Sequence, residues 1–308
     1  MTESVLTLDN VVKTYGDFTA VNGISLDIPK GAIYGFLGPN GAGKTTTIRM
    51  ILDIVKPTSG RISLLGHDSA IDVRNRIGYL PEEKGLYKKM KVWAIIQYFA
   101  RLKGMDKKAA KLKAFALLEK YGLSDFADAK IESLSKGMGQ KVQVLSAVAH
   151  DPEFVILDEP FSGLDPVNQS VLEELIIDMA NNGQTVIFST HVMQHAERLC
   201  DRILLISKGL KIFDGTVAEA KATIPRRVII TTGSDVSSLK QLTGVRDITP
   251  IDGDQWRIDI SESVDPQDIL AFCANANIAI RGFEFSESSL HDVFVSLVGD
   301  DAREQVKR

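Results

Sequence analysis

The chain has 308 residues and a mass of 33.7 kDa, more than one compact domain usually needs, so we expect two domains. Hydrophobic residues make up 44% and charged residues 25%, which excludes a largely disordered or fibrous chain. The net charge of -4 argues against a nucleic-acid binder that relies on bulk positive charge, and two distant cysteines, Cys200 and Cys273, favour a reduced cytosolic protein.

The first predicted elements are short antiparallel strands between residues 5 and 27. Apolar and polar residues alternate there, and turn-forming residues stand at 15–17 and at 22–23. An apolar strand over 32–37 then runs into a Gly-rich loop. Apolar residues from 48 to 55 recur at the i, i+3, i+4, i+7 spacing of an amphipathic helix. A strand, a loop and a helix in this order are typical of a phosphate-binding site.

The middle of the chain alternates helices and buried strands. Residues 92–149 are predicted to be helical, with the last of these helices beginning at Lys141. Strands are predicted over 154–157 and 185–188, with a helix over 171–179 between them. Alternating strands and helices indicate a parallel sheet that is covered on both faces.

A second pattern begins after Thr223. Strands are predicted over 227–232, 256–260 and 278–285, with a hairpin turn at 252–254, and helices follow Pro266 and Ser288. No stretch of the chain approaches the ~20 apolar residues that span a bilayer. We therefore expect a first domain of residues 1–223 and a small α+β domain of residues 224–308.

The loop after the 32–37 strand carries a phosphate-binding motif. It fits G-x-x-x-x-G-K-[ST], which a random chain of this length would match about 1% of the time. The glycines let successive N–H groups face one anion, Lys44 supplies a cation for the outer phosphates, and Thr45 supplies a hydroxyl for Mg²⁺. An ordinary Gly-rich turn with a surface lysine is the alternative. The predicted nucleotide-binding residues are Gly38, Pro39, Asn40, Gly41, Ala42, Gly43, Lys44, Thr45 and Thr46.

Two carboxylates, Asp158 and Glu159, follow the 154–157 strand. Acidic residues at a strand end are often only solvated caps. A nucleoside triphosphate site, however, needs one carboxylate to hold Mg²⁺ and often another to position the attacking water. Asp158 suits the first role, and Glu159 suits the second as a general base.

Residues 134–141 read Leu-Ser-Lys-Gly-Met-Gly-Gln-Lys, which alone predicts a helix cap at Ser135. Together with the two motifs above, this stretch resembles the signature loop of the ATP-binding cassette (ABC) family, whose usual form is L-S-G-G-Q. The resemblance covers about residues 6–215, and the other family motifs occur in order. They are an aromatic residue expected to stack on adenine, the Q-loop, the D-loop and the switch histidine, at Tyr15, Glu82, Asp165 and His191.

The resemblance implies an α/β fold: a P-loop NTPase cassette with a parallel-sheet core, an antiparallel β subdomain and a helical subdomain of about residues 86–149. It implies a Mg-dependent ATPase whose cofactors are ATP and Mg²⁺, with Glu159, Glu82 and His191 as catalytic residues and Thr45, Glu82 and Asp158 as metal ligands. His191 would donate to the γ-phosphate. The Ser135 hydroxyl and the Gly137 N–H of an opposite subunit would complete the cradle around it, so two chains, either two copies or a related pair, would join head to tail.

Two motifs depart from the family pattern. Glu82 replaces the usual Q-loop glutamine, and Lys136 and Met138 alter the signature. Glu82 can still accept from metal-bound water, but it brings negative charge close to the phosphates. Ser135 and Gly137 keep the phosphate-facing chemistry. We therefore expect an active but slow ATPase, with a binding-only site as the alternative.

The chain is similar to bacterial ATP-binding subunits for sodium efflux and drug export, which carry an extra C-terminal domain. This branch implies export through a separate integral-membrane permease and a cytoplasmic location, peripheral on the inner face of the cell membrane. The helical subdomain would dock on the permease, with apolar residues of 93–99 either in that contact or in the core. The C-terminal domain would steady or regulate the dimer, and no nucleic-acid partner is expected. The alternatives are a nucleotide-sensing module and an ABC ATPase that acts on DNA or ribosomes.

Overall fold

The computed structural model describes residues 4–83, 85–261 and 263–299 of the chain. The chain divides into two compact units, Met1–Thr216 and Val217–Arg308. Within the described residues, no helix combines the length and the apolar character that crossing a membrane requires.

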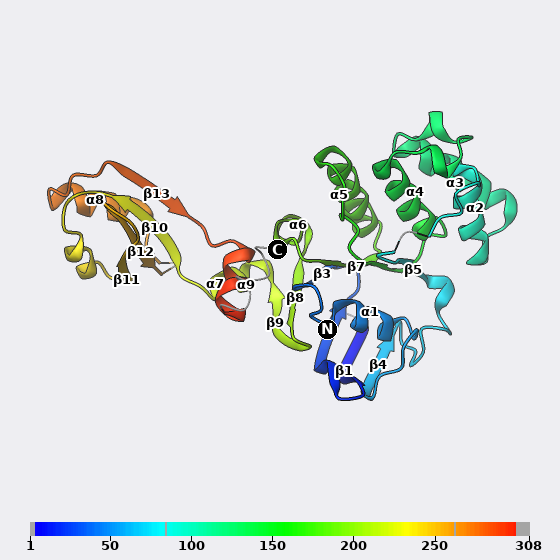
Figure 1. The fold of residues 1–308 in the computed structure, drawn as a ribbon, viewed down its shortest axis with the longest axis horizontal. Coiled ribbons are helices and arrows are strands. Elements are labelled where there is room, and N and C mark those ends of the chain that lie inside the picture. Colours follow the sequence, from blue (N-terminus) through cyan, green and yellow to red (C-terminus); the bar gives the residue numbers. More distant parts are fainter. Residues whose placement is uncertain (1–3, 84, 262, 300–308) are drawn as a thin grey trace. The chain divides into compact units, whose positions relative to one another are not determined.

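A six-stranded sheet forms the centre of the first unit, in the order β5–β6–β7–β3–β8–β9 (Figure 1). Neighbouring strands are parallel except β9, which pairs antiparallel with β8. The strands predicted over 154–157 and 185–188 are confirmed, whereas the short β5 was not predicted. The strand bounds are β3 Ile33–Leu37, β5 Ile77–Leu80, β6 Phe154–Leu157, β7 Thr185–Thr190, β8 Arg202–Ser207 and β9 Leu210–Thr216.

A separate antiparallel sheet contains β1 (Ser4–Tyr15), β2 (Phe18–Pro29) and β4 (Ser59–Leu64) in the order β2–β1–β4. The predicted turn at 15–17 joins β1 to β2. The second predicted turn, at 22–23, is wrong, because β2 continues through it. Gly23 has a left-handed φ of 69° and lies where the pairing register shifts, next to Asn10 with a φ of 45°. The residues that favour a turn here form a β-bulge instead.

Helices cover both faces of the six-stranded sheet (Figure 1). Helix α1 (Lys44–Ile51) and the antiparallel sheet cover one face, where Ile48 and Ile51 pack with Tyr34 and Phe36 of β3. Helix α1 begins before the predicted 48–55 segment and ends four residues earlier. The other face carries α4, α5 and α6, whose bounds are Lys136–Val148, Pro166–Asn181 and Met193–Leu199.

The helical subdomain contains α2 (Val92–Leu102), α3 (Lys107–Lys120) and α4. Ile95 and Ile96 of α2 are fully buried, so these apolar residues belong to the core. The predicted start of the last helix at Lys141 is wrong. Helix α4 begins at Lys136 because the Ser135 hydroxyl accepts from the Met138 N–H (3.2 Å) and caps it.

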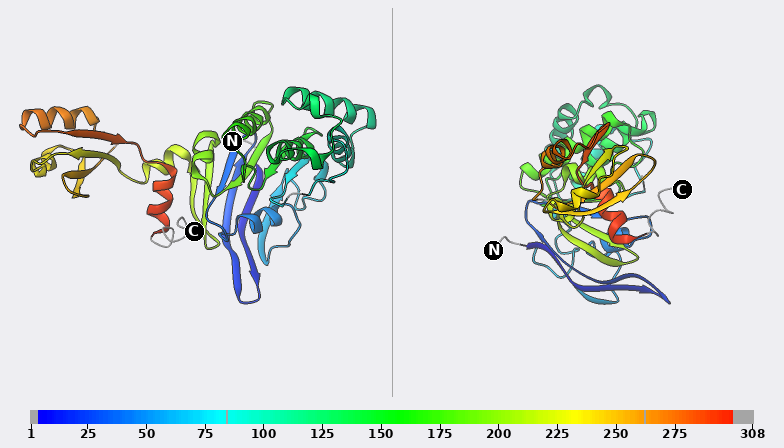
Figure 2. Two further views of the ribbon diagram at one scale, coloured as in Figure 1. Left: turned by 45° about the horizontal axis from the view of Figure 1, so that its top comes forward. Right: turned by 90° about the vertical axis from the view of Figure 1, so that its left-hand side faces the viewer.

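The second unit is built on an antiparallel sheet in the order β11–β12–β10–β13, with α8 packed against it (Figure 2). The hairpin predicted at 252–254 joins β11 to β12. The strand predicted over 278–285 is wrong in its first half. Ile278 is buried in the core as part of a connection, and β13 begins only at Gly282. The bounds are α7 Val217–Ala222, β10 Arg226–Thr231, β11 Val245–Pro250, β12 Gln255–Ile260, α8 Pro266–Asn275, β13 Gly282–Ser286 and α9 Leu290–Val298.

Candidate active site at the strand ends

Four of the predicted motifs lie at one edge of the six-stranded sheet. Glu82 comes two residues after β5, Asp158 and Glu159 follow β6, His191 follows β7, and the phosphate loop follows β3. These four strands are parallel neighbours in the order β5–β6–β7–β3. Their carboxyl ends therefore meet at the same edge, which is where ligands bind to open α/β sheets.

The phosphate loop is packed too closely for side chains at two of its glycines. A Cβ on Gly38 would lie 2.2 Å from the Ile206 carbonyl oxygen, and one on Gly43 would lie 2.6 Å from the Ala20 carbonyl oxygen. Gly43 is the N-cap residue of α1, with a φ of 108°, and no side chain caps this end of the helix. The first N–H groups of α1 are thus left for another acceptor, which makes this helix end suited to an anion.

Lys44 crosses the mouth of this loop. Its ammonium group donates to the carbonyl oxygens of Gly38 (2.7 Å) and Pro39 (3.2 Å) and lies 3.5 Å from Glu159 Oε1. The lysine side chain is only 6% exposed, so its charge is balanced here by the carboxylate. A bound anion at the loop would compete for the same ammonium group.

Ser189 of β7 holds the two carboxylate residues together. Its hydroxyl donates to Asp158 Oδ1 (2.5 Å) and accepts from the backbone N–H of Glu159 (2.9 Å). Asp158 is 1% exposed, and Glu159 has a left-handed φ of 49° that turns the chain sharply after β6. The sequence analysis did not select Ser189 as a site residue, although this serine directly follows the strand predicted over 185–188.

The side chains at this point fit a magnesium ion. Asp158 Oδ2 is buried and has no hydrogen-bond partner among the described residues, and Thr45 Oγ1 lies 3.5 Å from Asp158 Oδ1. Carboxylate and hydroxyl oxygens suit this hard cation, which usually keeps waters and phosphate oxygens as its other ligands. No group of three or more His, Cys, Asp or Glu residues in the described ranges could hold a metal by itself. The remaining ligands would therefore come from phosphate, from water or from Glu82.

His191 is directed toward the second carboxylate. Its Nδ1 lies 3.0 Å from Glu159 Oε2, while the imidazole remains half exposed. Glu159 therefore has two partners of its own chain, Lys44 on one oxygen and His191 on the other.

A cavity of about 340 Å³ lies over the phosphate loop. Besides the loop residues, it is lined by Phe18, Ala20, Glu82 and Glu159. Tyr15 does not line it; that ring is 49% exposed and lies under the Lys13 ammonium at 5.0 Å. Phe18, which pairs with Tyr15 across the β1–β2 turn, is the aromatic side chain in the lining, and the sequence interpretation did not select it.

Ser135, Gly137 and Asp165 form a separate cluster at the N-terminal ends of α4 and α5. A Cβ on Gly137 would lie 2.3 Å from the Asn168 amide nitrogen, so the glycine packs directly on that side chain. The Asp165 carboxylate accepts from the Asn168 backbone N–H (2.9 Å) and from its amide (2.6 Å). We call these residues the signature cluster, and none of them lines the phosphate-loop cavity.

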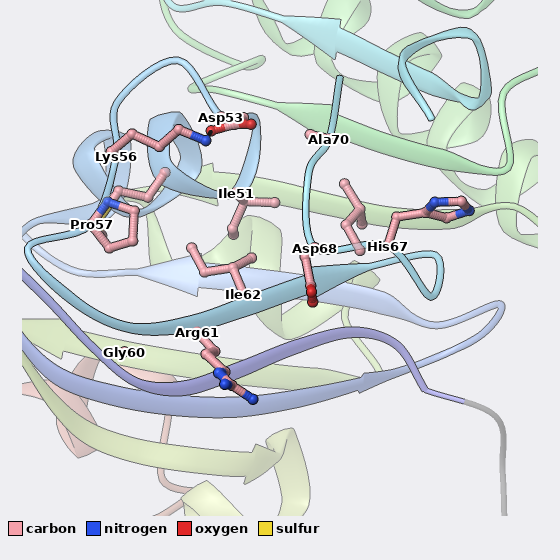
Figure 3. Close-up of a pocket in the computed structure, with 12 residues that line it drawn as sticks. Ile51, Asp53, Lys56, Pro57, Gly60, Arg61, Ile62, His67, Asp68 and Ala70 are labelled. Carbon is pink, nitrogen blue, oxygen red and sulfur yellow. Dashed lines mark ion pairs between the residues drawn. The ribbon is translucent and has the colours of Figure 1, made fainter. Parts of the chain in front are cut away.

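A second hollow, of about 320 Å³, lies beside α1 and β4 (Figure 3). Its buried carboxylate, Asp53, is 2.5 Å from the Lys56 ammonium and accepts from the Ser69 hydroxyl at 2.5 Å. Burial acts to raise the pKa of Asp53, but these two partners together hold it below its usual value. The charges of Asp53 and Lys56 are thus already paired, and this hollow contains no predicted site residue.

Two family models match the chain. The first, described as ABC transporter, matches residues 21–162, and the second, described as ATP-binding protein DrrA1-3-like, C-terminal domain, matches residues 215–298.

Several relatives match nearly the whole chain. It is 44% identical to the ABC transporter ATP-binding protein YhaQ of Bacillus subtilis, over 96% of this chain and 99% of the relative. It is 36% identical to the Nod factor export ATP-binding protein I of Burkholderia orbicola, over 96% and 97%. It is 30% identical to the daunorubicin resistance ATP-binding protein DrrA3 of Streptomyces coeruleorubidus, over 98% of each chain.

Solved structures match about two thirds of the chain or slightly more. One ATP-binding subunit of an ABC transporter superposes with a TM-score of 0.66 at 28% identity, over 71% of this chain and 93% of that one. A cassette solved as a dimer with ADP and Pi superposes with a TM-score of 0.63 at 24% identity, over 68% and 98%, and so shares the fold.

Proposed function

The chain belongs to the ATP-binding subunits of ABC transporters, and from that premise we propose that it hydrolyses ATP in a head-to-tail dimer to drive export through a separate membrane permease. The observation that carries the proposal is the Lys44–Glu159–His191 chain of contacts beside the phosphate loop. It places a cation for the phosphates, a general base and a hydrogen-bond donor within one small space.

Nucleotide binding would rearrange these contacts in a defined order. The outer phosphates would draw the Lys44 ammonium away from the Gly38 and Pro39 carbonyls and from Glu159. Glu159 Oε1 would then be free to accept a proton from the attacking water, while His191 still fixes Oε2. Thr45 and Asp158 would hold Mg²⁺, which supplies charge neutralisation on the phosphates.

The signature cluster supports the dimer. Ser135 and Gly137 lie outside the phosphate-loop cavity of their own chain, so the γ-phosphate cradle is incomplete in one copy. A second subunit that presents the same cluster would close it. A related cassette of the same fold was solved as a dimer with ADP and Pi, which fits this arrangement.

Two further observations favour a permease partner and export. The helical subdomain exposes large apolar side chains, among them Leu102 (61%) and Leu112 (64%), and exposed apolar side chains on one subdomain favour a protein partner. Relatives along almost the whole chain carry names of export and drug-resistance ATP-binding proteins. We place the subunit on the inner face of the cell membrane through that permease, and we assign to the second unit a role in steadying or regulating the dimer.

The test is a phosphate-release assay on Glu159→Gln with Glu153→Gln as the matched control. Glu153 lies at the other end of β6 in an exposed ion pair with Arg76. Loss of the general base should lower turnover by about 10²–10⁴ and leave ATP binding intact, whereas the control should stay within about twofold of the parent. Turnover of Glu159→Gln close to that of the parent would refute the assignment. A parent that binds ATP but releases no phosphate would favour a nucleotide-sensing module. The permease is tested separately by purifying the chain from detergent-solubilised membranes. A multispanning membrane protein should copurify with it, and the absence of such a protein would contradict the transport role.

A further inference from the structure

Two charged side chains in the predicted motifs, Glu82 and Lys136, have no partner of opposite charge among the described residues. Glu82 lines the phosphate-loop cavity, and Lys136 is the first residue of α4, between Ser135 and Gly137 of the signature cluster. Both side chains are exposed. Neither makes a hydrogen bond or an ion pair with any residue in the part of the chain that the structure describes.

Each charge is unfavourable where it stands in a single chain. A lysine in the first turn of a helix faces the positive end of the helix dipole. Glu82 shares its cavity with Glu159, and a triphosphate at the loop would add further negative charge to it. An added charge of the opposite sign would therefore stabilise each of them.

Lys136 lies beside Gly163, two residues before Asp165 of the D-loop. A Cβ on Gly163 would lie 2.0 Å from the Lys136 ammonium nitrogen, so the ammonium lies directly against this glycine. Gly163 also has a left-handed φ of 69°, which favours glycine there. The ammonium group thus lies beside the loop that leads to Asp165, among the residues proposed to face the other subunit.

We propose that Lys136 of one copy forms an ion pair with Glu82 of the partner subunit when ATP closes the dimer. The inference rests on the head-to-tail dimer of the proposed function and names the charges by which one copy recognises another. The partner is a second copy of this chain, because the chain itself carries both members of the pair. Each closed dimer contains the pair twice, and each pair offsets the negative charge that Glu82 brings to the phosphates.

Mixing two charge-reversed chains tests the pair. Glu82→Lys and Lys136→Glu are each introduced into Glu159→Gln, which should hold ATP without turnover, and one chain carries a donor fluorophore and the other an acceptor. Either variant alone places like charges at both sites, so its ATP-dependent dimerisation should weaken about tenfold or more. The mixed dimer has opposite charges at both sites, one pair original and one reversed. Its affinity should recover to within about threefold of the parent.

Glu83→Lys is the matched control, because Glu83 does not line the cavity. Mixed with Lys136→Glu it leaves one original pair and one site with two glutamates, so its affinity should stay between that of Lys136→Glu alone and that of the charge-reversed mixture. Thermal unfolding of each variant checks that these exposed substitutions leave the fold intact. If the parent dimerises with ATP and the mixture stays as weak as the single variants, the ion pair is refuted and the dimer stands. Recovery only when both reversals are on one chain would place the pair within a subunit and also refute the inference. If the parent itself fails to dimerise, the proposed function falls and the pair falls with it.

Discussion

Ser189→Ala is the substitution that tests the site most directly, because it removes one oxygen atom that serves two carboxylate residues. The Ser189 hydroxyl donates to Asp158 Oδ1 and accepts from the Glu159 N–H, and the serine is fully buried. Alanine would leave the charged oxygen without this donor and the peptide N–H without an acceptor. The resulting space is small and lined by polar groups.

The magnitude follows from those two losses. A hydrogen bond to a charged group contributes about 1.5–3 kcal/mol, and a buried unsatisfied peptide group costs about 1–3 kcal/mol. Partial relaxation of the neighbours reduces the sum, so we expect the free energy of unfolding of the first unit to fall by about 3 kcal/mol. Turnover should fall as well, since Asp158 and Glu159 lose their common support.

Urea unfolding provides the measurement. Trp93 belongs to the first unit and Trp256 to the second, so fluorescence in a Trp256→Phe background reports on the first unit alone. Ser146→Ala is the matched control, because that buried hydroxyl donates only to the neutral Val142 carbonyl (2.7 Å) and its loss should cost about 1 kcal/mol or less. A loss below about 1 kcal/mol for Ser189→Ala, with unchanged phosphate release, would refute the supporting role of Ser189.

Gly38→Ala should abolish ATP binding in an equilibrium binding assay, because its Cβ would collide with the Ile206 carbonyl oxygen. Gly139→Ala is the control: its Cβ meets no neighbour within 4 Å, so this change within α4 should raise the thermal stability slightly. Binding of ATP by Gly38→Ala at parental affinity would contradict the loop geometry. Burial and the nearby Lys103 charge lower the pKa of His150 from 6.5 to about 4 in the folded chain. As the pH falls, this histidine is therefore protonated in the unfolded chain before it is protonated in the folded chain. Stability should therefore be full above pH 6.5 and decline as the pH falls toward 4. His150→Gln should flatten that decline in thermal melts recorded across this pH range. An unchanged dependence of the melting temperature on pH would exclude His150 as the cause.

The parts of the site that could be predicted from sequence are those with a local geometric reason. The phosphate loop needs its glycines and its lysine at fixed spacing between a strand and a helix, so residues 38–46 could be recognised without any tertiary contact. The serine that supports Asp158 could not be recognised in the same way. Ser189 reaches it across two paired strands, 31 residues along the chain, and no short motif records which side chain faces which.

The errors in the fold have equally specific causes. The helix cap predicted at Ser135 is confirmed, but the helix predicted to begin at Lys141 begins at Lys136, because the cap overrides the low helix propensity of Gly137 and Gly139. Residues 22–23 favour a turn, yet pairing with β1 on both sides keeps them in β2 as a bulge. In both places a nearby hydrogen-bond network decides between conformations that the local sequence allows equally.

The pairing of Lys44 with Glu159 bears on why a single subunit should hydrolyse ATP poorly. In a single chain Glu159 Oε1 lies 3.5 Å from the Lys44 ammonium and Oε2 lies 3.0 Å from His191 Nδ1, so an attacking water would have to displace a partner from one of these oxygens. Only a ligand that attracts the Lys44 ammonium more strongly than Glu159 does would release it. A triphosphate meets that condition, so binding of the nucleotide and activation of the base would be one event. The remaining γ-phosphate contacts would still wait for Ser135 and Gly137 of a second copy, and release of the base alone would therefore leave turnover low until the dimer closes.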